Sequence, residues 1–282
     1  MSVFREIYHT MLPVDYTVST WLTLGALLQC ILVALLPRNV ALLPPIAIFM
    51  VRFIRGYLIA KGALPNPVTK EVTHGRQTWQ IPSADGTVAT TGSRESIVVL
   101  VLSASFSHPN GRYSPGSKTM NDYFVAMWLD AQENREKYGY LGNTPALYTQ
   151  DDGTRQDTKG STAVYLSYWK SLEGLHRFAH AGPHMKGQLW WENGAMNNFP
   201  HLGVSHEVYE VPAGNWENVY HNFRPFGITN TEYPVPVINE ESGKESVQWV
   251  SGLRSADGKD WKNMQSRMGR KAVFGATKPT RL

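Results

Sequence analysis

An uncharged apolar run near the N-terminus constrains this chain more than any other feature. Residues 16–36 contain no Asp, Glu, Lys or Arg. As an α-helix the run would be about 31 Å long, which matches a bilayer hydrocarbon core of about 30 Å. A secretory signal peptide would have a basic start and a shorter apolar core, whereas Arg5 is offset here by Glu6 and Asp15. We expect an uncleaved membrane helix; the alternative is a core helix of a soluble domain.

A second, shorter apolar run follows. Residues 40–51 are interrupted by two prolines, and 12 residues are few for a second span. Arg52, Arg55 and Lys61 then alternate with apolar side chains, which suits a helix lying among lipid head groups. A membrane-spanning helical hairpin is the alternative. Because most basic residues follow the first run, the positive-inside rule places the main domain in the cytosol. We expect the membrane of the endoplasmic reticulum.

Charge and cysteine content narrow the classes of partner. The net charge of +4 is too small to indicate a nucleic-acid partner, and no recognition motif is present, so we expect none. Cys30 is the single cysteine and lies in the apolar run. An intrachain disulfide is therefore excluded, and neither a thiolate haem ligand nor a Cys-His nucleophile pair is expected.

Strand and helix patterns alternate through the middle of the chain. Strands are predicted over 96–105, 141–149, 162–169, 204–211 and 216–223, and helices over 121–138 and from Ser171 to a break at Gly182-Pro183, with helix resuming through Trp190 and Trp191. Residues 151–160 are polar and turn-rich, which predicts a hairpin connection. The order β-α-β-β-α-β with an extra terminal strand indicates an α+β, ferredoxin-like fold.

The chain divides into four predicted segments. Residues 1–60 form the membrane anchor, 61–95 a linker or an outer strand pair, 96–230 the ferredoxin-like domain, and 231–282 a basic tail. Residues 254–282 hold eight Lys or Arg against two Asp and show little periodicity. We therefore expect the tail to be solvated and partly disordered.

Histidines concentrate in one stretch of the predicted domain. Six of the nine fall between His176 and His221, and histidine is both the side chain that titrates nearest neutrality and a common metal or haem ligand. His176 and His180 would share one face of a helix. No HExxH motif is present, and Gly182-Pro183 is expected to turn His184 away, so we predict no metal site. Ordinary helix histidines, exposed or hydrogen-bonded, are the alternative.

The strand over 204–211 supplies the other candidates for catalysis. His206 shares one strand face with two valines, and Tyr209 shares the opposite face with Glu207. Facing a pocket, His206 could act as a general base; the alternative is a core histidine with satisfied hydrogen bonds. We take His206, His180 and Tyr209 as the catalytic candidates. Large aromatic side chains that could line an apolar substrate cavity are Trp169, Phe178, Trp190, Trp191 and Trp216.

Several short motifs carry a family resemblance over about 96–228. They are the helix start around Trp169, Ser171, Leu172 and Glu173, the LHRFAH run, the Trp190-Trp191 pair, and His206-Glu207 with Tyr209, Gly214, Trp216, Glu217 and Tyr220. In these motifs the chain resembles a mostly fungal family that is grouped with the antibiotic-biosynthesis-type (ABM) monooxygenases. The resemblance implies a dimeric α/β-barrel, in which two ferredoxin-like units pair their sheets as a homodimer.

The resemblance also implies an activity. Related barrel enzymes oxidise lipophilic natural products with O₂ and often use neither metal nor flavin, because the deprotonated substrate reacts with oxygen directly. Other branches, including aldoxime dehydratases and dye-decolourising peroxidases, bind haem through a histidine, a role that His176 could fill here. We expect a membrane-anchored monooxygenase, without a cofactor, that acts on a terpenoid- or polyketide-type secondary metabolite in a fungal biosynthetic pathway. The alternatives are a haem-dependent dehydratase or oxygenase and a non-catalytic binding module for a lipophilic intermediate.

Overall fold

A computed structural model describes residues 11–149, 160–238 and 245–270. The chain forms two compact units, Met1–Val72 and Thr73–Leu282, and each is described by itself. The predicted hairpin connection over 151–160 and the last part of the predicted tail, 271–282, lie almost entirely outside the described residues.

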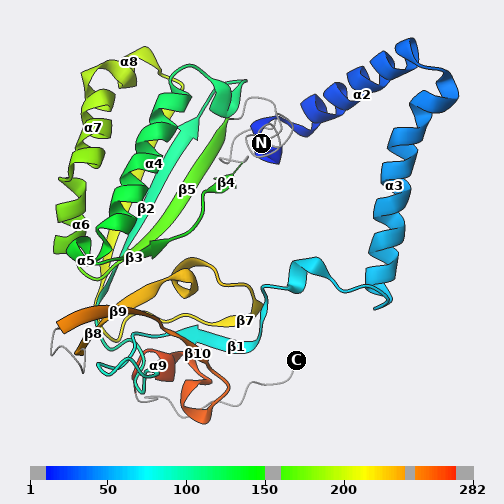
Figure 1. The fold of residues 1–282 in the computed structure, drawn as a ribbon. Coiled ribbons are helices and arrows are strands. Elements are labelled where there is room, and N and C mark those ends of the chain that lie inside the picture. Colours follow the sequence, from blue (N-terminus) through cyan, green and yellow to red (C-terminus); the bar gives the residue numbers. More distant parts are fainter. Residues whose placement is uncertain (1–10, 150–159, 239–244, 271–282) are drawn as a thin grey trace, which may run out of the picture. The chain divides into compact units, whose positions relative to one another are not determined.

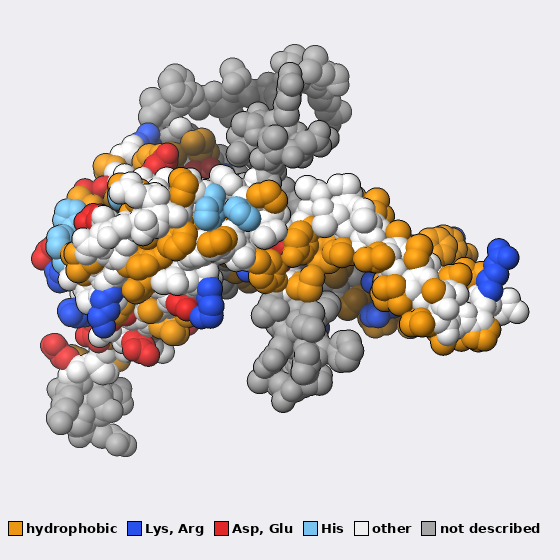
Figure 2. Space-filling view, turned by 90° about the horizontal axis from the view of Figure 1, so that it is seen from above, with side chains coloured by type: hydrophobic (Ala, Val, Ile, Leu, Met, Phe, Trp, Pro, Cys, Tyr) orange, Lys and Arg blue, Asp and Glu red, His pale blue; other side chains and the backbone are white. Residues whose placement is uncertain are grey.

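The N-terminal unit consists mainly of two long helices, α2 (Val18–Leu35) and α3 (Arg38–Ala60), which are separated by Leu36-Pro37. Thr17 caps α2 by accepting a hydrogen bond from the Thr20 N–H at 3.3 Å. Both helices are long and apolar enough to cross a membrane, and their most apolar 18-residue windows are 0% buried. Hydrophobic side chains cover much of their visible surface (Figure 2). They are therefore not core helices of the described structure.

The second apolar run, which we expected to be short for a membrane span, is part of a longer helix that also includes the basic segment after it. Pro44 and Pro45 lie inside α3, and the helix continues for 23 residues. A proline inside a helix leaves the carbonyl four residues earlier without its donor. For Pro45 that carbonyl belongs to Ala41, and the Gln29 side chain of α2 donates to it at 3.0 Å. A neighbouring helix thus supplies the missing hydrogen bond.

The second unit contains a ferredoxin-like domain. Its strands are β2 (Ile97–Phe106), β3 (Tyr140–Asn143), β4 (Leu147–Thr149), β5 (Ser161–Trp169) and β6 (Leu202–Val211), and its helices are α4 (Ser117–Glu133), α5 (Arg135–Tyr138), α6 (Leu172–Ala179), α7 (Gly182–Trp190) and α8 (Met196–Asn198), with a π-helical turn at Trp191–Ala195. The antiparallel sheet has the order β3-β5-β2-β6, and β4 also pairs with β5. This confirms the predicted α+β, ferredoxin-like topology.

The helices cover one face of this sheet (Figure 1). Alternate residues of β2, including Val98, Leu100 and Leu102, point to that face and pack against Met127 of α4 and Phe178 of α6. This period-two burial explains why β2 reads as a buried strand in the sequence. The helix layer leaves β6 partly uncovered, because Val204 and Val208 remain 41% and 40% exposed.

Several predicted elements have different bounds in the structure. The helix expected over 121–138 starts at Ser117 and breaks at Asn134, so it becomes α4 and α5. The weak strand at 141–149 is two short strands, β3 and β4. Gly182-Pro183 does interrupt the next helix, but Pro183 lies in the first turn of α7, where its missing N–H costs nothing.

An additional β-structure completes the second unit. Strands β1 (Thr73–Trp79), β7 (Tyr220–Phe223) and β10 (Leu253–Ser255) form a sheet in the order β10-β1-β7, and β8 (Glu232–Ile238) pairs with β9 (Glu245–Ser251). A short helix, α9 (Met264–Arg267), follows. The prediction of a partly disordered tail is therefore wrong for the described residues between 232 and 267. Part of the segment predicted as a linker or an outer strand pair is β1, and the predicted strand at 216–223 shortens to β7, which pairs with β1.

This additional β-structure packs against the ferredoxin-like domain through a second hydrophobic cluster. Its buried members are Trp79, Ile81, Ile97, Leu141, Trp216, Ile228 and Tyr233. Buried Arg267 also donates to Glu217 at 2.6 Å and to the Trp261 carbonyl at 3.0 Å. The segments before and after the ferredoxin-like domain thus share one core with it.

Candidate functional site

A cavity lies between the helices and the sheet of the ferredoxin-like domain. Its volume is about 330 Å³. Most of its lining is apolar or aromatic, with two imidazoles and one carboxylate: Leu102, Met120, Tyr123, Phe124, Met127, Pro183, His184, Gly187, Gln188, Trp190, Trp191, Glu192, Val204 and His206. Strands β2 and β6 form its floor, and α4, α7 and the π-helical turn form its walls.

The structure brings three of the predicted site residues together here: His206, Trp190 and Trp191. His206 lies opposite Leu102 in the β2–β6 register, so both side chains leave the sheet on the helix side. Trp190 ends α7, and Trp191 begins the π-helical turn, with their ring centroids 6.2 Å apart. Trp190, Trp191 and Glu192 all line the cavity, and the backbone departs from helical geometry just after them, at Gly194.

The other predicted aromatic residues do not line this cavity. Trp169 and Phe178 are almost fully buried in the main core, and their rings lie 4.8 Å apart. Trp216 belongs to the second hydrophobic cluster, where its indole N–H donates to the Glu95 carbonyl at 2.8 Å. Tyr209 is exposed on the other side of β6 and donates to the Glu207 carboxylate. Trp169, Phe178 and Trp216 are therefore buried, as large aromatic side chains are expected to be, but they belong to the hydrophobic cores and not to the cavity lining.

His176 and His180 are exposed and do not line the cavity either. His176 lies in the last turn of α6, and the Nδ1 of His180, its C-terminal cap, is 2.8 Å from the His176 carbonyl oxygen. A haem bound in this cavity would be held by His184 or His206, which line it, and not by His176. Within the described residues, no three His, Cys, Asp or Glu side chains converge as a metal site would require.

His184 also lines the cavity, although the sequence predicts that Gly182-Pro183 turns it away. Pro183 lies in the first turn of α7, and the helix places His184 over the sheet, where its ring packs edge-on against Phe178 with centroids 5.6 Å apart. Its Nδ1 is buried and has no hydrogen-bond partner among the described residues. Burial lowers the pKa of His184; the Ala179 carbonyl acts in the opposite direction, and the nearby imidazoles of His206 and His180 lower it further. The net effect favours the neutral form of the His184 imidazole.

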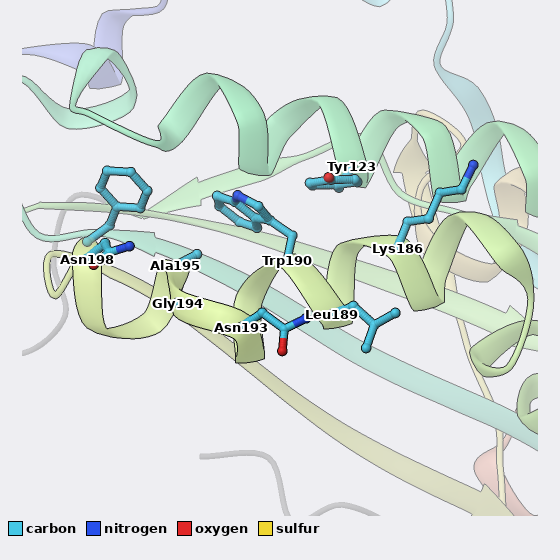
Figure 3. Close-up of a pocket in the computed structure, with 9 residues that line it drawn as sticks. Tyr123, Lys186, Leu189, Trp190, Asn193, Gly194, Ala195 and Asn198 are labelled. Carbon is cyan, nitrogen blue, oxygen red and sulfur yellow. The ribbon is translucent and has the colours of Figure 1, made fainter.

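A second, more open hollow of about 480 Å³ lies between α4, α7 and α8 (Figure 3). It shares Tyr123 and Trp190 with the cavity, and the two rings lie side by side with centroids 5.5 Å apart. Gly187 permits this close approach of α4 and α7, because a Cβ there would lie 3.3 Å from the Tyr123 Cβ. The Tyr123–Trp190 pair therefore borders both the open hollow and the cavity.

Comparisons with known proteins fit this architecture. Residues 97–228 match the family described as monooxygenase af470-like. The chain is similar to Monooxygenase af470 of Aspergillus fumigatus, with 30% identity over 259 residues, 92% of this chain and 90% of the relative.

Among solved structures, aldoxime dehydratase OxdRE in complex with butyraldoxime is similar at 15% identity and a TM-score of 0.36, over 56% of this chain and 41% of that chain. SnoaB, a cofactor-independent oxygenase from Streptomyces nogalater, is similar at 10% identity and a TM-score of 0.25, over 41% of this chain and 91% of that chain. These structural similarities are distant, so the assignment rests on the sequence comparisons. Because 92% of this chain aligns with Monooxygenase af470 at 30% identity, the chain belongs to the monooxygenase af470-like family and is a monooxygenase.

Proposed function

We propose that this chain is a membrane-anchored monooxygenase that oxidises a lipophilic secondary metabolite, of terpenoid or polyketide type, inside the cavity between the helices and the sheet. The observation that supports this most is the position of His184 and His206 in a largely apolar, aromatic cavity. Its volume, about 330 Å³, lies within the range of about 300–1,000 Å³ that small-molecule sites occupy. An apolar substrate would gain free energy from burial there, and the imidazoles would handle its proton.

In the proposed reaction, His206 takes a proton from an activated CH₂ group of the substrate. The resulting carbanion transfers electrons to O₂ and bonds to one of its oxygen atoms, and the proton on His206 then passes to the outer oxygen of this peroxide. Removal of the second C–H proton breaks the O–O bond and releases hydroxide; that proton and the hydroxide form one water, and a ketone remains. A CH₂ group and O₂ thus become a C=O group and water, and the substrate itself supplies the electrons. His184 assists by remaining neutral, because a second positive charge in the cavity would oppose protonation of His206.

Isotope labelling with the natural substrate tests this proposal. Deleting the gene in its host identifies the metabolite that accumulates, which is then given to the purified full chain with ¹⁸O₂. We expect one labelled oxygen in the product and the other in water, and we expect His206→Ala to lower kcat/KM by about 10²–10⁴-fold. His221→Ala is the matched control, since His221 is exposed on β7 and lies outside the cavity.

Two other outcomes would contradict the proposal. A Soret absorption band that disappears in His184→Ala or His206→Ala would show a haem enzyme. Saturable binding of the metabolite without any product, in wild type and variants alike, would show a binding module.

The homodimer implied by the family resemblance is part of the proposal. The sheet face opposite the helices carries half-buried Val99, Val101, Val164 and Leu166, an apolar surface that a second copy would cover. Light scattering of the detergent-solubilised chain should give the mass of a dimer, and Val101→Glu should give a monomer. A monomeric wild type would refute the dimer and leave the proposed reaction unaffected.

A further inference from the structure

We propose that α2 and α3 both cross the bilayer as a hairpin, so that the segments before α2 and after α3 lie on the same side of the membrane. The inference builds on the membrane anchoring proposed above and adds the number of spans. At 1.5 Å per residue the 18 residues of α2 and the 23 of α3 would be about 27 Å and 34 Å long, close to the hydrocarbon thickness of about 30 Å.

The hydrogen bond between the two helices fits an environment without water. Pro45 has no N–H to give the Ala41 carbonyl, and in water a solvent molecule could take that place. Instead the Ala41 residue is 0% exposed, and the Gln29 amide donates to its carbonyl from the middle of α2. In hydrocarbon, both the Gln29 amide and the freed carbonyl would otherwise be without a partner. The bond therefore satisfies the Gln29 amide and the Ala41 carbonyl in a place where lipid would offer neither of them a partner.

The charged residues lie where two complete spans would place them. Arg38 begins α3 next to the connection between the helices, and no other charged residue occurs from 16 to 51. A hairpin that entered only half of the bilayer would leave this guanidinium in hydrocarbon, which is costly. Two complete spans bring it to the far head groups. Arg52 and Arg55 lie in the last part of α3, and their long side chains can reach the near head groups.

The two open ends of the hairpin carry aromatic residues that favour the membrane interface. Tyr16 and Trp21, at the start of α2, pack edge to face at 5.4 Å. Tyr57, near the end of α3, lies under the Lys61 ammonium at 5.8 Å. The two open ends therefore both have the residue types expected at a membrane interface, as they should if they lie at the same one. Because Arg52, Arg55 and Lys61 also lie at that end, the positive-inside rule makes it the cytosolic one.

Cysteine labelling in sealed microsomes tests this topology. Cys30 is the single cysteine, so Cys30→Ser gives a cysteine-free chain into which Asn39→Cys or Lys70→Cys is introduced. A membrane-impermeant maleimide should label Lys70→Cys in sealed vesicles and Asn39→Cys only after permeabilisation. Protease should remove an epitope tag placed before Met1 from the sealed vesicles.

Each other outcome overturns the hairpin in a recognisable way. Labelling of Asn39→Cys in sealed vesicles means that the connection does not reach the lumen. Protection of the N-terminal tag, with Lys70→Cys labelled, means a single span. In both cases the chain still pellets with carbonate-washed membranes, so the anchoring stands. Release into the carbonate supernatant would refute both the hairpin and the anchoring.

A second comparison tests the interhelical bond itself. Gln29→Leu should increase the fraction of Asn39→Cys that is labelled in sealed vesicles, because the Ala41 carbonyl loses its donor. Thr23→Val is the matched control, since the Thr23 hydroxyl donates to the Ser19 carbonyl of its own helix at 2.9 Å. Equal labelling in Gln29→Leu, Thr23→Val and the parent would show that the bond does not hold the hairpin in place.

Discussion

At the scale of single residues, the proposed chemistry of the cavity depends on His184 and His206, and the sequence alone does not show what surrounds these two imidazoles. The alternation of Val204, His206 and Val208 predicted that these side chains share one face of β6, and Val204 and His206 both line the cavity. The sequence could not show that Pro183 begins a new helix and does not deflect the chain, so His184 was set aside. A proline four residues after the end of a helix is as suited to the first turn of a new helix as to a break. Only the packing of α7 on α4 distinguishes the two.

The buried imidazole of His184 predicts how stability depends on pH. In the unfolded chain it binds a proton near its ordinary pKa of 6.5, whereas burial lowers the pKa in the folded chain. The free energy of unfolding should therefore fall as pH decreases through 6.5 towards the folded-state pKa. His184→Phe should reduce this dependence, measured by urea unfolding between about pH 8 and about pH 5. His221→Phe, at an exposed position, should leave it unchanged; an unchanged slope in His184→Phe would contradict the assignment.

At the scale of elements, uninterrupted patterns were predictable and short polar strands were not. Strands β2, β5 and β6 contain long β-branched or alternating runs, and all three were predicted within a few residues of their observed bounds. Strand β1, with the sequence THGRQTW, has only one large apolar side chain. Its pairing partners, β7 and β10, lie more than a hundred residues away. Nothing local in the sequence specifies such a strand, because its stability comes from distant contacts.

The start of α6 offers a test of a predicted cap. Ser171 was expected to cap this helix, and its hydroxyl accepts from the Gly174 N–H at 3.1 Å. Ser171→Ala should lower the free energy of unfolding by about 1 kcal/mol, and Ser171→Asp should lower it much less. Urea denaturation of the detergent-solubilised chain measures both. Equal stability of wild type and Ser171→Ala would show that the cap contributes nothing.

At the scale of the whole molecule, the buried ion pair between Arg267 and Glu217 fastens the C-terminal segment to the domain. The side chains are only 7% and 20% exposed. Arg267→Met would leave the Glu217 carboxylate partly buried without its partner, so we expect a loss of about 3 kcal/mol in unfolding free energy. Adding Glu217→Gln should restore part of it. Lys118→Met, which breaks an exposed pair with Asp122, should cost less than about 0.5 kcal/mol; an equal cost for the two single variants would contradict this view.

The shared core has a practical consequence for anyone who wishes to express the ferredoxin-like domain alone. The family match covers residues 97–228. Trp79 lies before that segment, and Tyr233 and Arg267 lie after it. A fragment cut at those limits would expose Ile97, Leu141 and Trp216 to solvent and would lose the cation that neutralises Glu217. Such a fragment should aggregate, whereas one beginning at Thr73 and extending past Arg267 retains every partner of that core.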